Sequence, residues 1–207
     1  MRRAKIAVFV SGGGTNLQAL LDAQQAGRLA SGEIVLVLAS RSDAYALTRA
    51  EKNGIPTAVV QRKDFGSQEA YEAELVRLMR ACEIDLIVLA GFMSILSKDF
   101  TDRFPKRILN IHPSLIPSFC GKGFYGIHVH EAALRYGVKV SGATVHFVNE
   151  IPDGGQIIKQ KAVSVLPNDT PETLQKRIMK EAEWIILPEA AEEVSAQILE
   201  SERSIHA

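Results

Sequence analysis

The chain has 207 residues, no net formal charge and 46% apolar residues. This length suits a single domain, and the apolar content is too high for a disordered chain. A neutral chain has no general attraction for nucleic acid or for a membrane surface, so we expect any anionic ligand to be held by a local site.

The cysteines and the N-terminal residues narrow the class of protein further. Cys82 and Cys120 show neither zinc nor CxxC spacing, and two thiols do not make a disulfide framework, which favours a reducing cytoplasm. The apolar run over 6–10 is too short for a signal peptide, and no stretch approaches the ~20 apolar residues that cross a bilayer. We therefore expect a cytoplasmic protein with no membrane or nucleic-acid partner.

The first half of the chain alternates strand and helix patterns. Apolar spacing at helical period predicts helices over 15–26, 44–53 and 68–81, and short apolar runs predict buried strands over 6–10, 34–39, 57–60, 86–90 and 107–111. This order predicts an α/β fold with a Rossmann-like, mostly parallel sheet flanked by helices.

After residue 113 the pattern changes. A loop rich in Gly, Pro and aromatic residues over 117–126 precedes a short helix near 129–136. Two further strands, over 143–148 and 156–165, are expected to form an antiparallel pair across a Pro-Asp-Gly-Gly turn. Thr170 and Pro171 begin a long C-terminal helix over 170–199, in which Pro188 should cause a kink or a break, and His206 is expected in a terminal tail.

A glycine-rich segment, Ser11-Gly12-Gly13-Gly14-Thr15-Asn16, lies between the first expected strand and the first expected helix. The dinucleotide pattern GxGxxG fails because Leu17 stands at the third glycine position, and the Walker pattern fails because no Lys-Ser/Thr follows. A tight strand-to-helix turn needs fewer than three successive glycines, so we expect the helix N-terminus to bind a single phosphate here.

Two polar side chains lie at the end of a predicted strand, in Leu109-Asn110-Ile111-His112-Pro113. Residues i and i+2 of a strand point the same way, so Asn110 and His112 should project together. An amide donor beside an imidazole suits stabilising an oxyanion and moving a proton. Asp153 could orient that imidazole, although a hydrogen-bonded loop histidine and an Asx turn explain His112 and Asp153 equally well when each is taken singly.

Together these motifs resemble the phosphoribosylglycinamide formyltransferases, the folate-dependent enzymes of purine (IMP) synthesis. The resemblance covers about 5–190 and rests on SGGGTNLQAL (11–20), LAGFM (89–93), LNIHPSLIP (109–117), GATVHFV (142–148) and DGG (153–155). It implies a one-carbon transferase that moves the formyl group of 10-formyltetrahydrofolate, its co-substrate, to the amine of N1-(5-phospho-D-ribosyl)glycinamide without a metal. It also implies a monomer or homodimer whose ligands are small molecules.

The resemblance implies a role for each matching position. The catalytic residues would be Asn110, His112 and Asp153. The ribonucleotide would bind to Gly13, Gly14, Thr15, Asn16, Lys180 and Glu183, with the last two on one face of a helix. The folate would bind to Gln68, Met93, Ser94, Ile95, Leu96, Asn110, Val148, Asn149, Glu150, Ile151 and Asp153. The catalytic pocket would also be lined by Thr144 and His146.

The same resemblance implies one formyltransferase domain over 1–207. About 1–100 would form the phosphate- or nucleotide-binding half, and about 101–200 the catalytic and folate-binding half. Ser94 and Gln68 depart from the pattern, because family members commonly carry arginine at both positions, toward the folate; Arg62 or Lys63 is a possible source of the missing charge. The segment over 119–126 is longer than in some relatives.

Three alternatives stay open. A formyltetrahydrofolate hydrolase shares the catalytic trio but usually carries an N-terminal regulatory domain, for which a first strand near residue 5 leaves no room. Methionyl-tRNA formyltransferase typically adds a basic C-terminal RNA-binding domain, which we do not expect here. A phosphate-binding module without catalysis would not need Asn110, His112 and Asp153 together.

The pair His128-x-His130 lacks a third ligand at a recognisable spacing, so we interpret it as a helix-start pair rather than a metal site.

Overall fold

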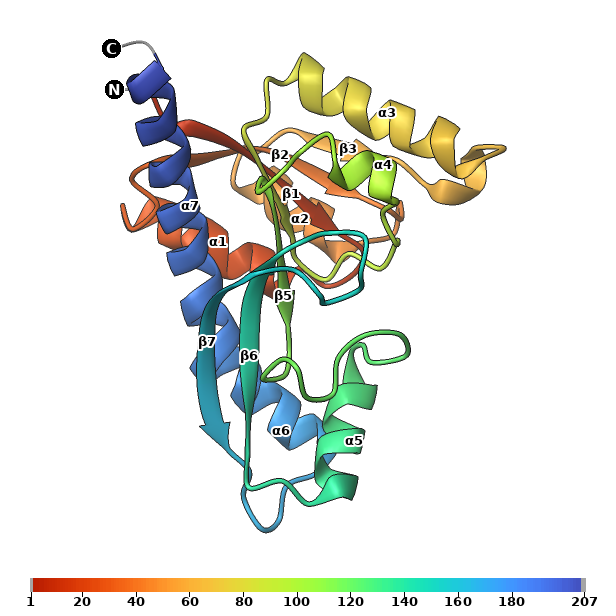
Figure 1. Ribbon diagram of the computed structural model, residues 1–207, viewed down its shortest axis with the longest axis vertical. Helices are drawn as coiled ribbons and strands as arrows, with labels where there is room; N and C mark the ends of the chain where they lie inside the picture. Colours follow the sequence, from red (N-terminus) through yellow and green to blue (C-terminus); the bar gives the residue numbers. More distant parts are fainter. Residues whose placement is uncertain (1, 206–207) are drawn as a thin grey trace.

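The computed structural model describes residues 2–205, and His206 lies outside that range. One seven-stranded sheet runs through the molecule in the order β3-β2-β1-β4-β5-β6-β7 (Figure 1). The parallel strands are β1 (Ala4–Val10), β2 (Gly32–Ala39), β3 (Thr57–Val59), β4 (Leu86–Leu89) and β5 (Ile108–His112). The antiparallel strands are β6 (Val140–Phe147) and β7 (Ile157–Ser164). The predicted Rossmann-like α/β fold is therefore confirmed.

Helices cover both faces of the sheet because alternate strand residues are apolar on both sides. Val8 and Val88 face the core formed with α1 (Thr15–Gln25), α2 (Tyr45–Lys52) and the C-terminal helices. Phe9 and Leu89 face the core formed with α3 (Gln68–Ala81) and α4 (Lys98–Thr101). A 3-10 turn, Arg62–Asp64, precedes α3, and α5 (Ile127–Tyr136) packs against α6 (Pro171–Ile178) at the far end of the sheet (Figure 1).

Two differences from the predicted elements have a clear physical reason. Helix α4 was not predicted, because four residues are too few for a helical period; its start is fixed by Ser97, whose hydroxyl accepts the Phe100 N–H at 3.2 Å. Strand β6 begins at Val140 rather than at Ala143. The glycine at 142 looks like a turn in the sequence, yet here it lies inside the ladder opposite Ala162.

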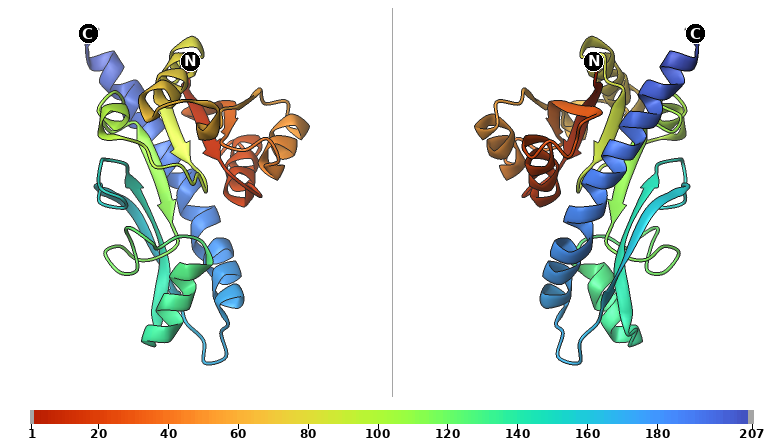
Figure 2. Two further views of the ribbon diagram at one scale, coloured as in Figure 1. Left: turned by 90° about the vertical axis from the view of Figure 1, so that its right-hand side faces the viewer. Right: turned by 90° about the vertical axis from the view of Figure 1, so that its left-hand side faces the viewer.

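The predicted C-terminal helix consists of α6, a π-helical turn over Met179–Glu183 and α7 (Trp184–Ile205), the long helix along the sheet in Figure 2. A capping box between Thr170 and Thr173 starts α6. Of the kink or break expected at Pro188, the break does not occur, because α7 continues through this residue. Proline lacks the N–H that would bond to the carbonyl of Trp184, so α7 continues with one backbone hydrogen bond fewer just after the π turn.

The strand order by itself predicts where a ligand binds. The chain fills β1, β2 and β3 outward in one direction and then crosses to β4 on the other side of β1. Ligands of open α/β sheets bind at the carboxyl ends of the strands beside such a switch point. The glycine loop follows β1, and His112 ends β5 at the same edge. Within residues 2–205, no helix is both long and apolar enough to span a membrane.

Candidate active site

The glycine loop presents unused donors at the start of α1. Among residues 2–205, none of the hydrogen bonds involves a backbone N–H of residues 12–17 as donor. Gly14 adopts a left-handed conformation (φ 70°) at the N-cap, which turns the chain into the helix without a side chain at the cap. Free N–H groups at a helix N-terminus attract an anion, so the loop has the geometry of a phosphate site.

Asn16 and Glu183 join the glycine loop to the π turn. The Asn16 amide donates to Oε2 of Glu183 at 2.7 Å, whereas the Asn16 Oδ1 is buried without a protein partner. Burial raises the pKa of Glu183 to about 7, against the hydrogen bond from Asn16, which lowers it. Lys180 and Glu183, expected on one helix face, both lie in the π turn, where Lys180 is exposed and Glu183 is buried.

The predicted catalytic residues come together beside β5. Asn110 pairs with His146 of β6 in the antiparallel ladder, and Asp153, on the connection from β6 to β7, approaches both side chains. The Asn110 amide donates to Nε2 of His146 at 3.2 Å and has a long 3.5 Å contact with Oδ1 of Asp153. One of its two hydrogens is thus well bonded and the other is available to a ligand.

His112 is buried, and its two ring nitrogens have different neighbours. Nε2 lies 2.8 Å from the Phe119 carbonyl, so Nε2 carries a proton, and Nδ1 lies 3.5 Å from Oδ2 of Asp153. Burial lowers the pKa of His112 below its ordinary value, although Asp153 opposes the shift. A second proton on Nδ1 would therefore point at Asp153 and form an ion pair.

Asp153 is held in the turn by its backbone and by its side chain. It has a φ of 57°, and its Oδ2 accepts the Gly121 N–H at 2.8 Å. Burial alone would raise the pKa of Asp153, but His146, His112 and the Gly121 amide together hold it below its ordinary value. Gly155 is required beside it, since a Cβ there would lie 1.7 Å from the Phe147 carbonyl oxygen. The site thus holds an ionised carboxylate beside a neutral imidazole at neutral pH.

A cavity opens next to the trio, between the segment after β4 and the β6–β7 connection. Most of the predicted folate residues line it, namely Ser94, Ile95, Leu96, Asn110, Val148, Asn149, Glu150, Ile151 and Asp153. Ile95 and Ile151 are exposed, which gives the cavity an apolar mouth. An apolar cleft that ends at convergent polar groups is typical of a site for a planar organic ligand.

Three predicted positions lie outside this cavity. Gln68 stands behind its wall and donates to the Ile95 carbonyl at 3.2 Å. Met93 is exposed, and its N–H donates to the Ser11 hydroxyl at 2.9 Å, which ties the loops after β1 and β4 together. Thr144 is fully buried and donates to the Ser114 carbonyl at 2.7 Å, so it braces the loop after β5 rather than lining a pocket.

Other residues at the site were not predicted. Leu89, Phe92 and Pro152 line the cavity, and the LAGFM motif contains the first two of them. His130 is fully buried with neither ring nitrogen bonded, and burial, together with the nearby His112, lowers its pKa to about 4. His128 is exposed and faces Glu131 at 2.9 Å, so the two histidines of the pair do not converge.

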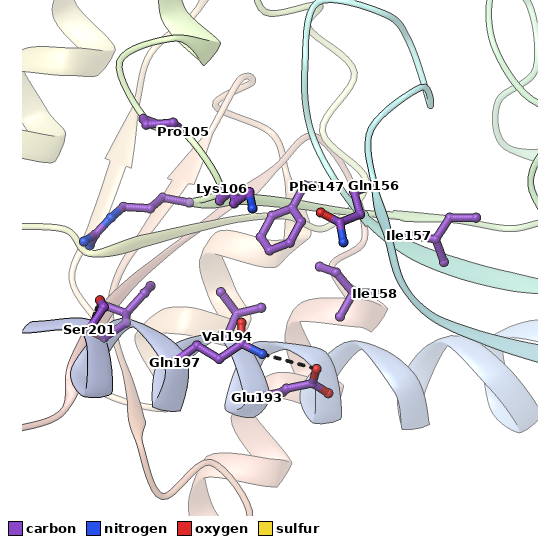
Figure 3. A pocket seen from close by; sticks show the side chains of 12 residues that line it. Pro105, Lys106, Phe147, Gln156, Ile157, Ile158, Glu193, Val194, Gln197 and Ser201 are labelled. Atoms are coloured by element: carbon purple, nitrogen blue, oxygen red, sulfur yellow. Dashed lines mark hydrogen bonds between the residues drawn. The ribbon is translucent and has the colours of Figure 1, made fainter. Parts of the chain in front are cut away.

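A second hollow lies on the opposite face of the sheet, against α7 (Figure 3). Its lining includes Phe147 and Val194, and the Gln197 amide donates to Glu193 at 3.5 Å. Strand alternation explains this placement, because Phe147 points away from the side on which His146 meets Asn110. Neither the glycine loop nor the trio reaches this hollow.

Residues 4–191 match the family model described as formyl transferase. The chain is 46% identical over 184 residues to the trifunctional purine biosynthetic protein adenosine-3 of Drosophila melanogaster. These aligned residues are 88% of this chain and only 13% of that longer protein. It is 42% identical over 184 residues to the phosphoribosylglycinamide formyltransferase of Haemophilus influenzae, covering 89% of this chain and 84% of that one.

A solved structure, glycinamide ribonucleotide transformylase 1 from Symbiobacterium toebii, superposes with a TM-score of 0.88 at 42% identity and covers 94% of this chain and 89% of that one. The matched range includes the glycine loop, the trio and the cavity wall. Sequence, fold and site geometry therefore agree, and the chain belongs to the formyl transferase family, among the phosphoribosylglycinamide formyltransferases.

Proposed function

We propose that this chain transfers the formyl group of 10-formyltetrahydrofolate to the amine of N1-(5-phospho-D-ribosyl)glycinamide, as a step of purine synthesis. The observation that carries this proposal is the position of the trio. Asn110, His112 and Asp153 lie at the carboxyl edge of the sheet, where the glycine loop also follows β1, and an apolar cavity opens beside them. A phosphorylated amine bound at the loop and a folate bound in the cavity would meet at the trio.

The reaction needs an oxyanion to be stabilised. The amine nitrogen attacks the formyl carbon, a C–N bond forms, and the carbonyl electrons move to oxygen. The available Asn110 amide hydrogen would donate to this oxyanion, and His112, once it takes a second proton, would stabilise it through its positive charge. Collapse of the tetrahedral intermediate breaks the bond to N10 of the folate, and that nitrogen takes a proton to give tetrahydrofolate.

Asp153 would stabilise the positive charge on the protonated imidazole of His112. A proton arriving on Nδ1 of His112 forms an ion pair with the carboxylate that faces it at 3.5 Å. The same carboxylate, which points into the cavity wall, would accept the proton that the attacking amine loses, through water. Its lowered pKa suits the first task, since Asp153 must be ionised when His112 becomes charged.

The two ligands would use different sets of residues. The phosphate would bind the N–H groups of Gly13, Gly14, Thr15 and Asn16, with Lys180 beside it and Glu183 accepting from the ribose hydroxyls. The folate would enter the cavity past Ser94 and Ile95. Ser94 and Gln68 carry no charge, but Arg62 donates to Gln68 at 2.9 Å. Arg62 would therefore supply the positive charge nearest the acidic end of the folate. We further propose that the protein works without a metal in the cytoplasm, as a monomer or a homodimer with small-molecule ligands.

A coupled spectroscopic assay tests this function. Purified protein is mixed with 10-formyltetrahydrofolate, with and without the ribonucleotide, and cofactor turnover is followed. Turnover that requires the ribonucleotide is expected. Turnover without it would instead identify a hydrolase, and a folded protein with no turnover in either mixture would favour a phosphate-binding module.

A further inference from the structure

We propose that Arg49, on α2, is a positioning residue for the substrate phosphate and acts through the carbonyl groups of the glycine loop. The inference rests on the proposed function, because it takes the loop as the phosphate site. Arg49 lies outside every motif that the sequence singles out. Its role follows from how the loop is held in place.

An anion-binding loop must turn its carbonyl oxygens away from the anion. Helix α2 does this for two successive residues. The Ala46 N–H donates to the Gly12 carbonyl at 3.1 Å, and Nε of Arg49 donates to the Gly13 carbonyl at 2.8 Å. With both oxygens bonded to α2, the unused N–H groups of the loop are left for the ligand. A loop without these two bonds would be free to turn a carbonyl toward the phosphate, which repels it.

The contact between the loop and α2 is close. A Cβ on Gly14 would lie 2.6 Å from Cβ of Ala46 and 3.4 Å from Cδ of Arg49. Helix α2 thus packs directly beneath the loop, and only glycine at this position lets the two segments approach. The side chain of Arg49 extends along this contact and is half-buried.

The guanidinium is fixed and its charge is not neutralised. Besides Gly13, it donates to Oε1 of Gln18 at 3.0 Å and lies over the ring of Tyr45 at 5.1 Å. Within the described part of the chain, no carboxylate lies within ion-pair distance of Arg49. A rigid positive charge beside a helix N-terminus adds to the potential that attracts a dianion.

Arg49→Met should raise the KM for the ribonucleotide by at least about tenfold, leave the KM for the folate unchanged and change kcat little. Arg49→Lys should give an intermediate KM, because an ammonium keeps the charge but cannot reach both Gly13 and Gln18. Arg28→Met is the matched control, since Arg28 lines the same surface hollow and carries the same charge but is not bonded to the loop. It should leave the KM unchanged.

The dephosphorylated substrate separates positioning of the phosphate from a general structural role. With ribosylglycinamide, the wild type and Arg49→Met should have equal kcat/KM, because the phosphate that Arg49 serves is absent. An equal fall in kcat/KM with both substrates would overturn the proposal, as would an unchanged KM for the ribonucleotide.

Binding measured without turnover keeps this inference separate from the proposed function. Ribose 5-phosphate should raise the melting temperature of the wild type and of Arg28→Met more than that of Arg49→Met, with ribose as the control. Equal shifts in all three proteins would refute the role of Arg49 even if the wild type transfers formyl groups. An inactive wild type that still shows the expected difference would refute the proposed reaction alone.

Discussion

Glu183→Gln removes the charge from a side chain that the fold buries. Glutamine has the same shape and still accepts the Asn16 amide hydrogen, which lies 2.7 Å from the present carboxylate. Burial raises the pKa of Glu183 from its ordinary 4.5 to about 7. Each tenfold change in proton affinity corresponds to about 1.4 kcal/mol, so ionised Glu183 should cost the folded protein about 3 kcal/mol.

The pH dependence has a definite sign. Because the pKa of Glu183 is higher in the folded protein than in the unfolded chain, the folded state holds the proton more tightly. Its stabilising contribution is complete below pH 4.5 and is lost as the pH rises through about 7. The variant and the wild type should therefore have similar free energies of unfolding near pH 5, and the variant should be more stable by about 3 kcal/mol at pH 8.

Urea unfolding followed by circular dichroism at several pH values between 5 and 8 measures this difference. Glu181→Gln is the control, because Glu181 lies in the same π turn but is exposed, and it should show no such trend. A constant difference between wild type and Glu183→Gln across the whole range would refute the reasoning, since Glu183 would then have the same pKa in the folded and unfolded states.

Four further substitutions test the site. His112→Ala and Asp153→Asn should each lower kcat by more than ~100-fold with the circular dichroism spectrum unchanged, and near-normal turnover would contradict their assignment. Lys180→Ala should raise the KM for the ribonucleotide but not for the folate, and equal KM values in variant and wild type would exclude a phosphate contact. Gly14→Ala should lower the free energy of unfolding by ~2–4 kcal/mol, since its φ is 70° and the new Cβ would overlap Ala46; a smaller loss in urea unfolding would show that α2 can move.

The strand and helix pattern was predictable because it follows from local periodicity. Asn110 and His112 point the same way for the same reason, since both belong to one short strand. The position of Asp153 could not be predicted, because it depends on the antiparallel register of β6 against β5 and on a turn with φ of 57°. The residues alone offered Asp153 as one interpretation among others, and only the family resemblance favoured it as the partner of His112.

The features that were missed depend on tertiary contacts. The π turn changes the facing of Lys180 relative to Glu183, and no local pattern marks it, because its residues also suit an α-helix. Arg49 looks like an ordinary basic residue near the end of α2, where it would suit the helix dipole. Its bond to Gly13 exists only because α2 packs beneath the loop.

The π turn also limits how the C-terminal helices can vary. Removing one residue from 179–183 would let the turn close as an α-helix. Because a π turn holds about one residue more than an α turn, α7 would keep its facing relative to α6. Leu187 and Ala190, now fully buried against the sheet, would stay in the core, whereas the contact between Glu183 and Asn16 would be lost or shifted. The extra residue thus serves the ligand edge and not the core face of α7. We therefore expect a one-residue deletion in this turn to leave the protein folded and to impair binding of the ribonucleotide.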